Sequence, residues 1–380
     1  MNSLNIGLIG CGGIMDAHLA GYKALYTAGL KVFNIRAVCD TYEQNARRKA
    51  EAVELIQGRR PNIYLNFEEM IKRESLDAVD IALPHNIHHT VACRCLEEGL
   101  HVIIEKPLGI TMRAARLIID AAEKYGKTLA VAENYRRSPE NRAIWWAIRQ
   151  NYIGDPRIVI WIAAGWNPNP WGWREDRFIA GGSWVFDGGV HLADLDRYQL
   201  GREAVDVYAV TETFDPIKKG VKVTVDDMTM AIIRFEGHVY VQWLWTRAAP
   251  GRDVNIRVIY GSRGALNGEG LRVQKEDSVE VHRMYMLVDK MMKSLKPEER
   301  ESMFPRGITD TFATELYDFY SAIVEKRKPE VDGWEAYKDM AIPLGFYESA
   351  VLGKPVKIKD IEELKIEEYQ GEINEKNGIR

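Results

Sequence analysis

Residues 5–15 read NIGLIGCGGIM, and this stretch decides the fold of the chain. Its first half is an apolar run that predicts a strand, and the glycine turn GCGGIM then opens a helix. Glycines at such a turn let the backbone bend sharply and let its N–H groups approach a pyrophosphate at the helix N-terminus. Met15 stands where the dinucleotide-binding fingerprint has a third glycine or alanine. The pattern predicts a dinucleotide site at the end of the first strand.

Apolar strands and helical periods alternate from this stretch to residue 133. The segments between the strands are apolar every three or four residues, as amphipathic helices are. Strands that are almost wholly apolar are typical of a parallel sheet covered on both faces, and the alternation indicates a doubly wound sheet. We therefore predict a Rossmann dinucleotide-binding domain over residues 1–133. The predicted strands are 5–10, 35–40, 78–84, 101–107 and 128–133.

Asp40 ends the second predicted strand, where a carboxylate would lie near the adenosine ribose of a dinucleotide. It would accept hydrogen bonds from the ribose hydroxyls and repel a 2′-phosphate, so NAD is favoured over NADP as the cofactor. No Lys or Arg directly follows Asp40, although Arg47 and Arg48 lie in the next helical stretch. The alternative is that Asp40 caps that helix.

The composition is that of an ordinary globular protein. A chain of 380 residues is long enough for two domains. The formal net charge of −4 gives no reason to expect nucleic acid or an anionic membrane as partner. No apolar run could span a bilayer, and the N-terminus enters a strand without a basic leader, so we expect a cytoplasmic protein. We expect buried, reduced thiols at Cys11, Cys39, Cys93 and Cys95.

The pattern changes after residue 134, and we predict a second domain over 134–380. Alternation in its longer strands (204–214, 229–248 and 254–266) indicates a mostly antiparallel sheet with one face toward solvent or a partner. Helical stretches follow, and the charged last twenty residues are expected to form a surface strand and tail. No low-complexity linker separates the two domains.

Residues 101–107, HVIIEKP, place Glu105 and Lys106 at the carboxyl end of a strand. Ligands bind at this edge of open α/β sheets. A lysine just past an apolar run is often only a surface residue, but this position favours a functional lysine near the nicotinamide.

Asp187 and His191 stand four residues apart in FDGGVHLADLD, on one face if the stretch is helical. Oxidation of a carbinol needs a base for the hydroxyl proton, and histidine titrates in the right range. A cation such as Lys106 would stabilise the developing alkoxide. The alternative is that Asp187 caps a helix and His191 is a core residue. A metal site built from Asp187, His191 and Asp194 is disfavoured because no zinc motif accompanies it, so we predict no metal.

Aromatic and cationic residues crowd the stretch before Asp187. Tryptophan faces suit the C–H faces of sugars and can stack on a nicotinamide, although tryptophans more often belong to a core. The arginines could bind hydroxyl or carboxylate groups or make surface pairs. The residues are Trp161, Trp166, Trp171, Trp173, Trp184, Arg174, Arg177 and, further upstream, Arg136.

Several motifs in this order resemble the glucose–fructose oxidoreductase / myo-inositol dehydrogenase (Gfo/Idh/MocA) family over nearly the whole chain. They are the glycine turn, PHNIH at 84–88, EKP at 105–107, YRRSP at 135–139, WRED at 173–176, the GG-x(4)-D-x-G-x-H-x-x-D pattern at 181–194 and ESAVLGKPV at 348–356. His85 departs from the asparagine that is frequent in the family. The resemblance implies a Rossmann domain followed by an α/β domain with a large open, mostly antiparallel sheet. That sheet often forms an oligomer interface, here the strand around Gln242 to Trp245, so a homodimer or homotetramer is expected.

The resemblance also implies roles for individual residues. Lys106 is expected to be the catalytic lysine, His191 the proton-transferring histidine, and Asp187 its substrate-binding neighbour. The expected substrate-binding residues are Lys106, Arg136, Trp166, Asp187 and His191. The expected cofactor-binding residues are Gly10, Gly12, Gly13, Ile14, Asp40, Leu83, Pro84, Asn86, His88, Glu105, Lys106, Trp173 and Arg174.

These observations predict an NAD-dependent oxidoreductase that transfers hydride to or from a hydroxyl-bearing carbon of a sugar, sugar derivative or inositol. One alternative is a redox-neutral glycosidase that uses NAD transiently on the same fold. A second is a non-catalytic sensor of sugar or cofactor, which the presence of both Lys106 and His191 disfavours.

Overall fold

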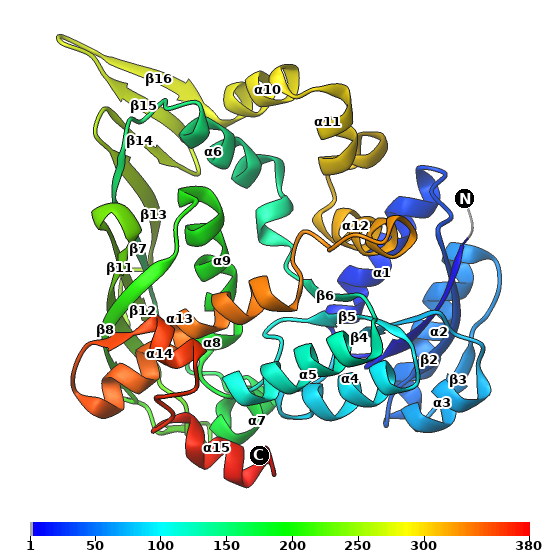
Figure 1. Ribbon diagram of the computed structural model, residues 1–380. Helices are drawn as coiled ribbons and strands as arrows, with labels where there is room; N and C mark the ends of the chain where they lie inside the picture. Colours follow the sequence, from blue (N-terminus) through cyan, green and yellow to red (C-terminus); the bar gives the residue numbers. More distant parts are fainter. Residues whose placement is uncertain (1–2) are drawn as a thin grey trace. The chain divides into compact units, whose positions relative to one another are not determined.

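The computed structural model describes residues 3–380 and divides them into two compact units (Figure 1). The first unit comprises the chain up to Gly109, Ala114–Arg137 and Lys296–Ala336, and the second comprises Ile110–Arg113, Ser138–Leu295 and Tyr337–Arg380. Residues 296–336 therefore pack with the N-terminal part of the chain. The boundary that we predict at residue 133 stays a prediction.

The first unit contains a six-stranded parallel sheet in the order β3-β2-β1-β4-β5-β6. Helices α1 and α12 lie on one face and α4 and α5 on the other (Figure 1). The strands are β1 (Leu4–Ile9), β2 (Phe33–Cys39), β3 (Asn62–Tyr64), β4 (Ala78–Ile81), β5 (His101–Glu105) and β6 (Leu129–Ala132). The helices are α1 (Ile14–Thr27), α2 (Glu43–Gln57), α3 (Phe67–Arg73), α4 (His88–Glu97), α5 (Met112–Tyr125), α11 (Pro297–Met303) and α12 (Thr311–Glu325). The doubly wound sheet is confirmed, with β3 as a strand that the sequence did not indicate.

From β1 the chain adds β2 and β3 on one side of the sheet, and it then returns to add β4, β5 and β6 on the other side. This change of direction between β1 and β4 places a crevice at their carboxyl ends. The core beneath joins β1, β2 and α1 to Ala313, Leu316 and Phe319 of α12. Met15 is fully buried in this core, so its long side chain fills the contact between helix and sheet.

The second unit contains a nine-stranded sheet in the order β16-β15-β14-β13-β7-β12-β11-β8-β17. Its pairs are antiparallel except for β7 and β12, so the predicted mostly antiparallel sheet is confirmed. The stretch 229–248 forms two strands because the chain turns at Gly237, whose φ is +66°. The strands are β7 (Pro156–Ala164), β8 (Ala204–Glu212), β11 (Met228–Phe235), β12 (Val239–Thr246), β13 (Val254–Gly261), β14 (Gly264–Asn267), β15 (Gly270–Gln274), β16 (Val279–Arg283) and β17 (Val356–Lys357).

Helices cover one face of this sheet, and Figure 1 shows α8, α9 and α13 along it. Trp243 and Trp245 point into this covered face, whereas Tyr240 and Gln242, which alternate with them, are exposed. The rings of Trp161, Trp184, Trp243 and Trp245 pack together, with centroids 5.1–6.1 Å apart. Trp161 is therefore a core residue, and the half-buried Trp184 packs against it. The helices are α6 (Pro139–Arg149), α7 (Arg177–Ala180), α8 (Trp184–Asp187), α9 (Gly189–Leu200), α10 (Met284–Ser294), α13 (Gly333–Leu352), α14 (Ile358–Glu362) and α15 (Gln370–Lys376).

The expectation of a strand and tail over the last twenty residues is wrong. Residues 370–376 form helix α15, which buries Gln370, Ile373 and Asn374. Their three- and four-residue spacing is that of a helix face. Because two of the three buried residues are polar, the segment has no apolar periodicity from which the helix could be predicted. Gln370 donates to Glu348 over 3.0 Å, and this bond holds the helix in place.

The four cysteines are free thiols; Cys11, Cys39 and Cys95 are buried as expected, whereas Cys93 is only half-buried. Burial raises the pKa of Cys11 and Cys39 to about 12. Among residues 3–380, no helix is both long enough and apolar enough to cross a membrane.

Candidate active site

The glycine turn lies at the carboxyl end of β1, directly before α1. Gly10 has φ +91°, and a Cβ there would lie 2.0 Å from the carbonyl oxygen of Ala82, so only glycine fits. A Cβ on Gly12 or Gly13 would meet nothing within 4 Å. Gly13 begins the helix without a side-chain cap, and the N–H of Asp16 donates to the carbonyl oxygen of Gly13 at 3.1 Å, so the N–H groups before Asp16 are the ones offered to an anion. The open space and these N–H groups fit a dinucleotide pyrophosphate.

Asp40 is fixed beside this turn. One carboxylate oxygen accepts the backbone N–H of Cys11 at 2.8 Å and the other accepts that of Tyr42 at 2.7 Å. Tyr42 is the N-cap residue of α2, so the alternative that Asp40 caps this helix is wrong. The carboxylate is half-buried and held by two amides, as a partner for ribose hydroxyls would be.

The loops after β4 and β5 are joined by His88. Its Nδ1 lies 3.0 Å from the carbonyl oxygen of Pro107, and its Nε2 lies 2.9 Å from that of Leu83. Burial and the neighbouring His85 lower the pKa of His88 to about 4, so the imidazole is neutral. His88 thus links Leu83 and Pro84 to the loop of Lys106. A neutral imidazole has a single N–H, so the ring donates to one of these two carbonyl oxygens, and this contact with the main chain makes His88 a positioning residue; the cofactor contact expected of it stays a prediction.

Glu105 belongs to a buried polar network that sequence reasoning missed. One oxygen of Glu105 lies 3.0 Å from Nε2 of His18, and the other accepts the backbone N–H of Lys106 at 3.1 Å. Nδ1 of His18 lies 2.9 Å from Asp80, which also accepts the hydroxyl of Tyr22 at 3.0 Å. Burial opposes the charge on His18, but the two carboxylates raise its pKa well above the usual value. A buried imidazolium therefore holds the residue that precedes Lys106.

Lys106 follows the last residue of β5 and is half-buried, and its peptide bond to Pro107 is cis. Asn86 is half-buried in the short helix after β4. The first unit thus brings the glycine turn, Asp40, Leu83, Pro84, Asn86, Glu105 and Lys106 to the carboxyl ends of four neighbouring strands. Arg136 also lies in this unit, buried, with its guanidinium 3.8 Å from Glu335.

Asp187 and His191 lie on two consecutive helices of the second unit. Helix α8 ends at Asp187, and α9 begins at Gly189. The stretch divides at Gly188, where a Cβ would lie 2.3 Å from the indole of Trp184. The expected helical spacing is therefore interrupted, although both side chains are buried, each less than 10% exposed.

Arg174 holds the carboxylate of Asp187, with Nε 2.6 Å from Oδ2. The guanidinium of Arg174 also lies 4.3 Å from the ring centre of Trp173, so the two residues of the WR pair contact each other. The next residue, Glu175, is buried, forms an ion pair with Arg247 and accepts the N–H of Trp171 at 2.7 Å. Glu175 thus fixes the loop that carries Arg174.

Trp166 and Trp171 lie at the surface of the same unit, 55% and 37% exposed. Trp166 forms a single bridge to Ala248. Arg177 pairs with Glu372, which is the surface role considered for it.

Comparison with known proteins identifies the family. The model of the Gfo/Idh/MocA oxidoreductase family with an NAD-binding Rossmann fold matches residues 4–133, and the model of the family's C-terminal domain matches 142–267. The chain belongs to the Gfo/Idh/MocA family. The predicted family and the NAD-binding domain are therefore confirmed, and the protein is an oxidoreductase.

Similar proteins act on sugars. This Gfo/Idh/MocA protein is 27% identical to a 1,5-anhydro-D-fructose reductase of Ensifer adhaerens over 293 residues, 77% of this chain and 83% of that one. It is 31% identical to a levoglucosan dehydrogenase of Pseudarthrobacter phenanthrenivorans over 70% of this chain and 73% of that one. A solved structure of levoglucosan dehydrogenase with NADH covers 94% of this chain and 99% of that chain, with 26% identity and a TM-score of 0.79.

Proposed function

We propose that this Gfo/Idh/MocA protein is an NAD-dependent dehydrogenase that oxidises one hydroxyl-bearing carbon of a sugar, sugar derivative or inositol, or reduces the matching carbonyl. The observation that carries the proposal is Asp187, buried beside the start of α9, whose Oδ2 lies 2.6 Å from Nε of Arg174. A fixed carboxylate four residues before His191 suits the binding of a polyol hydroxyl. The substrate classes of the two relatives support the choice of a sugar.

Each residue has a chemical role in this proposal. His191 accepts the hydroxyl proton of the carbinol, and Asp187 accepts a hydrogen bond from the substrate. The ammonium group of Lys106 stabilises the negative charge that develops on the oxygen as the carbinol becomes a carbonyl. The nicotinamide of NAD, when bound, takes up the hydride from carbon. In the reduction direction His191 returns the proton to oxygen.

The residues of the first unit hold the cofactor in this proposal. The N–H groups after Gly12 bind the pyrophosphate, and Asp40 accepts hydrogen bonds from the adenosine ribose. Ile14, Leu83, Pro84, Asn86, Glu105 and Lys106 line the nicotinamide side, and Trp173 and Arg174 are further cofactor-binding residues. Arg136 and Trp166 are proposed to bind substrate.

A spectroscopic assay tests the proposal. Purified protein is given NAD with levoglucosan, inositols, free sugars and glycosides, and NADH with 1,5-anhydro-D-fructose, while the absorbance of reduced nicotinamide is followed. A rise with NAD, or a fall with NADH, for one compound supports the dehydrogenase. Release of an aglycone without net NADH would instead support the redox-neutral glycosidase. Binding without turnover would support the sensor.

We propose that a second copy of the chain covers the open face of the nine-stranded sheet. This face carries Tyr208, Val210, Met230, Ile232 and Tyr240, each more than 40% exposed. They line a shallow cavity of about 580 Å³ whose one amide side chain is Gln242 and which has no charged lining residue among residues 3–380. A broad apolar patch of this kind marks an interface, and it can meet its own copy about a two-fold axis. We therefore propose that the protein forms a homodimer or homotetramer.

We also propose that the protein acts in the cytoplasm, where its four free thiols stay reduced.

A further inference from the structure

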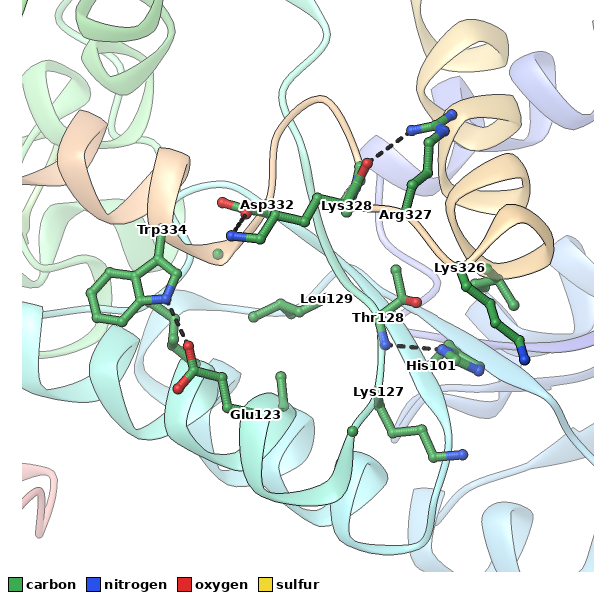
Figure 2. A pocket seen from close by; sticks show the side chains of 16 residues that line it. His101, Glu123, Lys127, Thr128, Leu129, Lys326, Arg327, Lys328, Asp332 and Trp334 are labelled. Carbon is green, nitrogen blue, oxygen red and sulfur yellow. Dashed lines mark hydrogen bonds and ion pairs between the residues drawn. The ribbon is translucent and has the colours of Figure 1, made fainter.

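A cavity of about 610 Å³ lies within the first unit, at the amino ends of β5 and β6. The glycine turn and Lys106 follow the carboxyl ends of strands in the same sheet, so the cavity is at the opposite edge from the proposed cofactor site. The start of each strand, the end of α5 and the loop that follows α12 form its walls (Figure 2). The proposed dehydrogenase chemistry does not use this cavity.

One end of the cavity is cationic. Four cationic side chains line it, and two of them are neutralised: Arg327 by Asp318 at 2.8 Å, and Lys328 by Asp332 at 3.3 Å. Lys127 and Lys326 have no carboxylate within ion-pair distance among residues 3–380. Figure 2 shows both of them on the side of the cavity where His101 lies. The cavity therefore offers two uncompensated ammonium groups to an anion.

His101 adds a neutral hydrogen-bond donor at this end. Its Nδ1 accepts the backbone N–H of Thr128 at 3.0 Å, which leaves the ring proton on Nε2. Burial, followed by the charge of Lys127, lowers the pKa of His101, so the ring stays neutral near pH 7. A neutral donor between two cations suits a carboxylate, phosphate or sulfonate group.

The other end is apolar and rigid. Leu129 of β6 and Ile119 of α5 line it next to Gly333, and Figure 2 shows Leu129 between His101 and Trp334. The indole N–H of Trp334 donates to Glu123 over 2.8 Å, and the guanidinium of Arg116 lies 4.7 Å from its ring. Because both contacts fix the indole, the apolar wall exists before any ligand binds.

We propose that this cavity binds a small organic anion with an apolar ring body. Its anionic group lies between Lys127, His101 and Lys326, and its ring lies over Leu129 toward Trp334. The volume is ample for a compound of one or two rings, and it lies within the usual range of small-molecule sites.

Two matched fluorescent probes test the proposal. Anilinonaphthalene sulfonate has the required anion and ring body, and N-phenylnaphthylamine has the same body without the charge. We expect Lys127→Gln/Lys326→Gln to weaken sulfonate binding by about tenfold or more, because charge-assisted contacts are lost, and to leave binding of the neutral probe within about twofold. The matched control is Lys23→Gln/Lys31→Gln, which removes the same charge elsewhere in this unit.

A blocking variant locates the probe. Ile323→Trp fills the cavity from α12 and is expected to abolish the saturable sulfonate signal, whereas Val324→Trp, at the next and exposed position, is expected to retain it. Circular dichroism and NADH binding show whether each variant is folded. If Ile323→Trp does not fold, the test rests on the Lys127→Gln/Lys326→Gln variant alone. The proposal is overturned if the wild type shows no saturable sulfonate binding, or if the lysine pair binds the sulfonate as tightly as its control.

Discussion

His18 and Glu105 lie 3.0 Å apart in the buried interior of the first unit, although 87 residues separate them in the chain. The same imidazole contacts Asp80 on its other side, so one cation stands between two carboxylates. Because Glu105 also accepts the backbone N–H of Lys106, the network fixes the loop that carries this lysine. Because the charge on His18 is buried, its contribution to the free energy of unfolding should depend measurably on pH.

Replacement of His18 by glutamine should destabilise the protein by about 3 kcal/mol at low pH, because two buried carboxylates lose their shared cation. The pKa of His18 is raised in the folded state. Its contribution is therefore complete below the unfolded pKa of about 6.5 and declines as pH rises above that value. Urea unfolding between about pH 6 and about pH 9 should show the difference between wild type and variant shrinking.

Tyr22→Phe is the control for this series, since it removes one hydroxyl bond to Asp80 without removing a charge. Its cost should be about 1 kcal/mol and flat over the same range. A His18→Gln difference that is equally flat would mean that the imidazole is neutral in the folded protein.

Two glycines of one turn should respond oppositely to alanine. Gly12→Ala should leave the free energy of unfolding within about 0.5 kcal/mol of wild type, because nothing in the chain meets the new Cβ. It should weaken NADH binding at least about tenfold, since the methyl group occupies space reserved for the pyrophosphate. Gly10→Ala should instead destabilise the fold itself by about 2 kcal/mol or more. Fluorescence titration with NADH beside thermal unfolding separates the two, and unchanged NADH affinity in Gly12→Ala would place the dinucleotide elsewhere.

Lys106→Met should lower kcat by about 10² to 10³, because an oxyanion loses its cation. The dissociation constant of NAD should change by less than about twofold. Steady-state kinetics with the substrate found in the absorbance assay gives kcat, and cofactor titration gives the affinity. Lys124→Met, an exposed lysine on α5, serves as control. A Lys106 variant within a few-fold of wild type would remove this residue from the chemistry.

The strands and the chemical motifs could be predicted from sequence because they are local. Apolar runs mark β1, β2, β4, β5 and β6, whereas the three residues of β3 are too few and too polar to stand out. The role of His18 could not be predicted, since one histidine on the buried face of a helix resembles a core residue until its distant partners are known. The packing of α12 against α1 joins residues about 300 positions apart, as the rings of His18 and Phe312 show with centroids at 5.4 Å. The break between α8 and α9 at Gly188 could not be predicted either, because it depends on the close approach of the Trp184 indole and not on residue spacing.

Arg174→Gln should lower kcat/KM by about tenfold to a hundredfold, because Asp187 loses the partner that holds it at 2.6 Å. The thermal midpoint should change little, since the Arg174 side chain is 37% exposed. Arg177→Gln is matched, because it removes an arginine of the same segment that pairs with Glu372 instead. Equal losses in the two variants would show that the effect comes from the segment and not from Asp187.

Ile232→Glu should dissociate the proposed oligomer. Ile232 is 56% exposed in the middle of β11, with Tyr208 and Gln242 as its cross-strand neighbours, so a charge there faces the partner copy directly. Burial of an unpaired carboxylate in an apolar interface costs several kcal/mol per protomer, which is enough to separate subunits at micromolar concentration. Sedimentation velocity should show the wild type as a dimer or tetramer and the variant as a monomer. Leu55→Glu, at an exposed leucine on α2, should sediment as the wild type does. If the wild-type protein sediments as a monomer, the proposal that a second copy covers this sheet face is wrong.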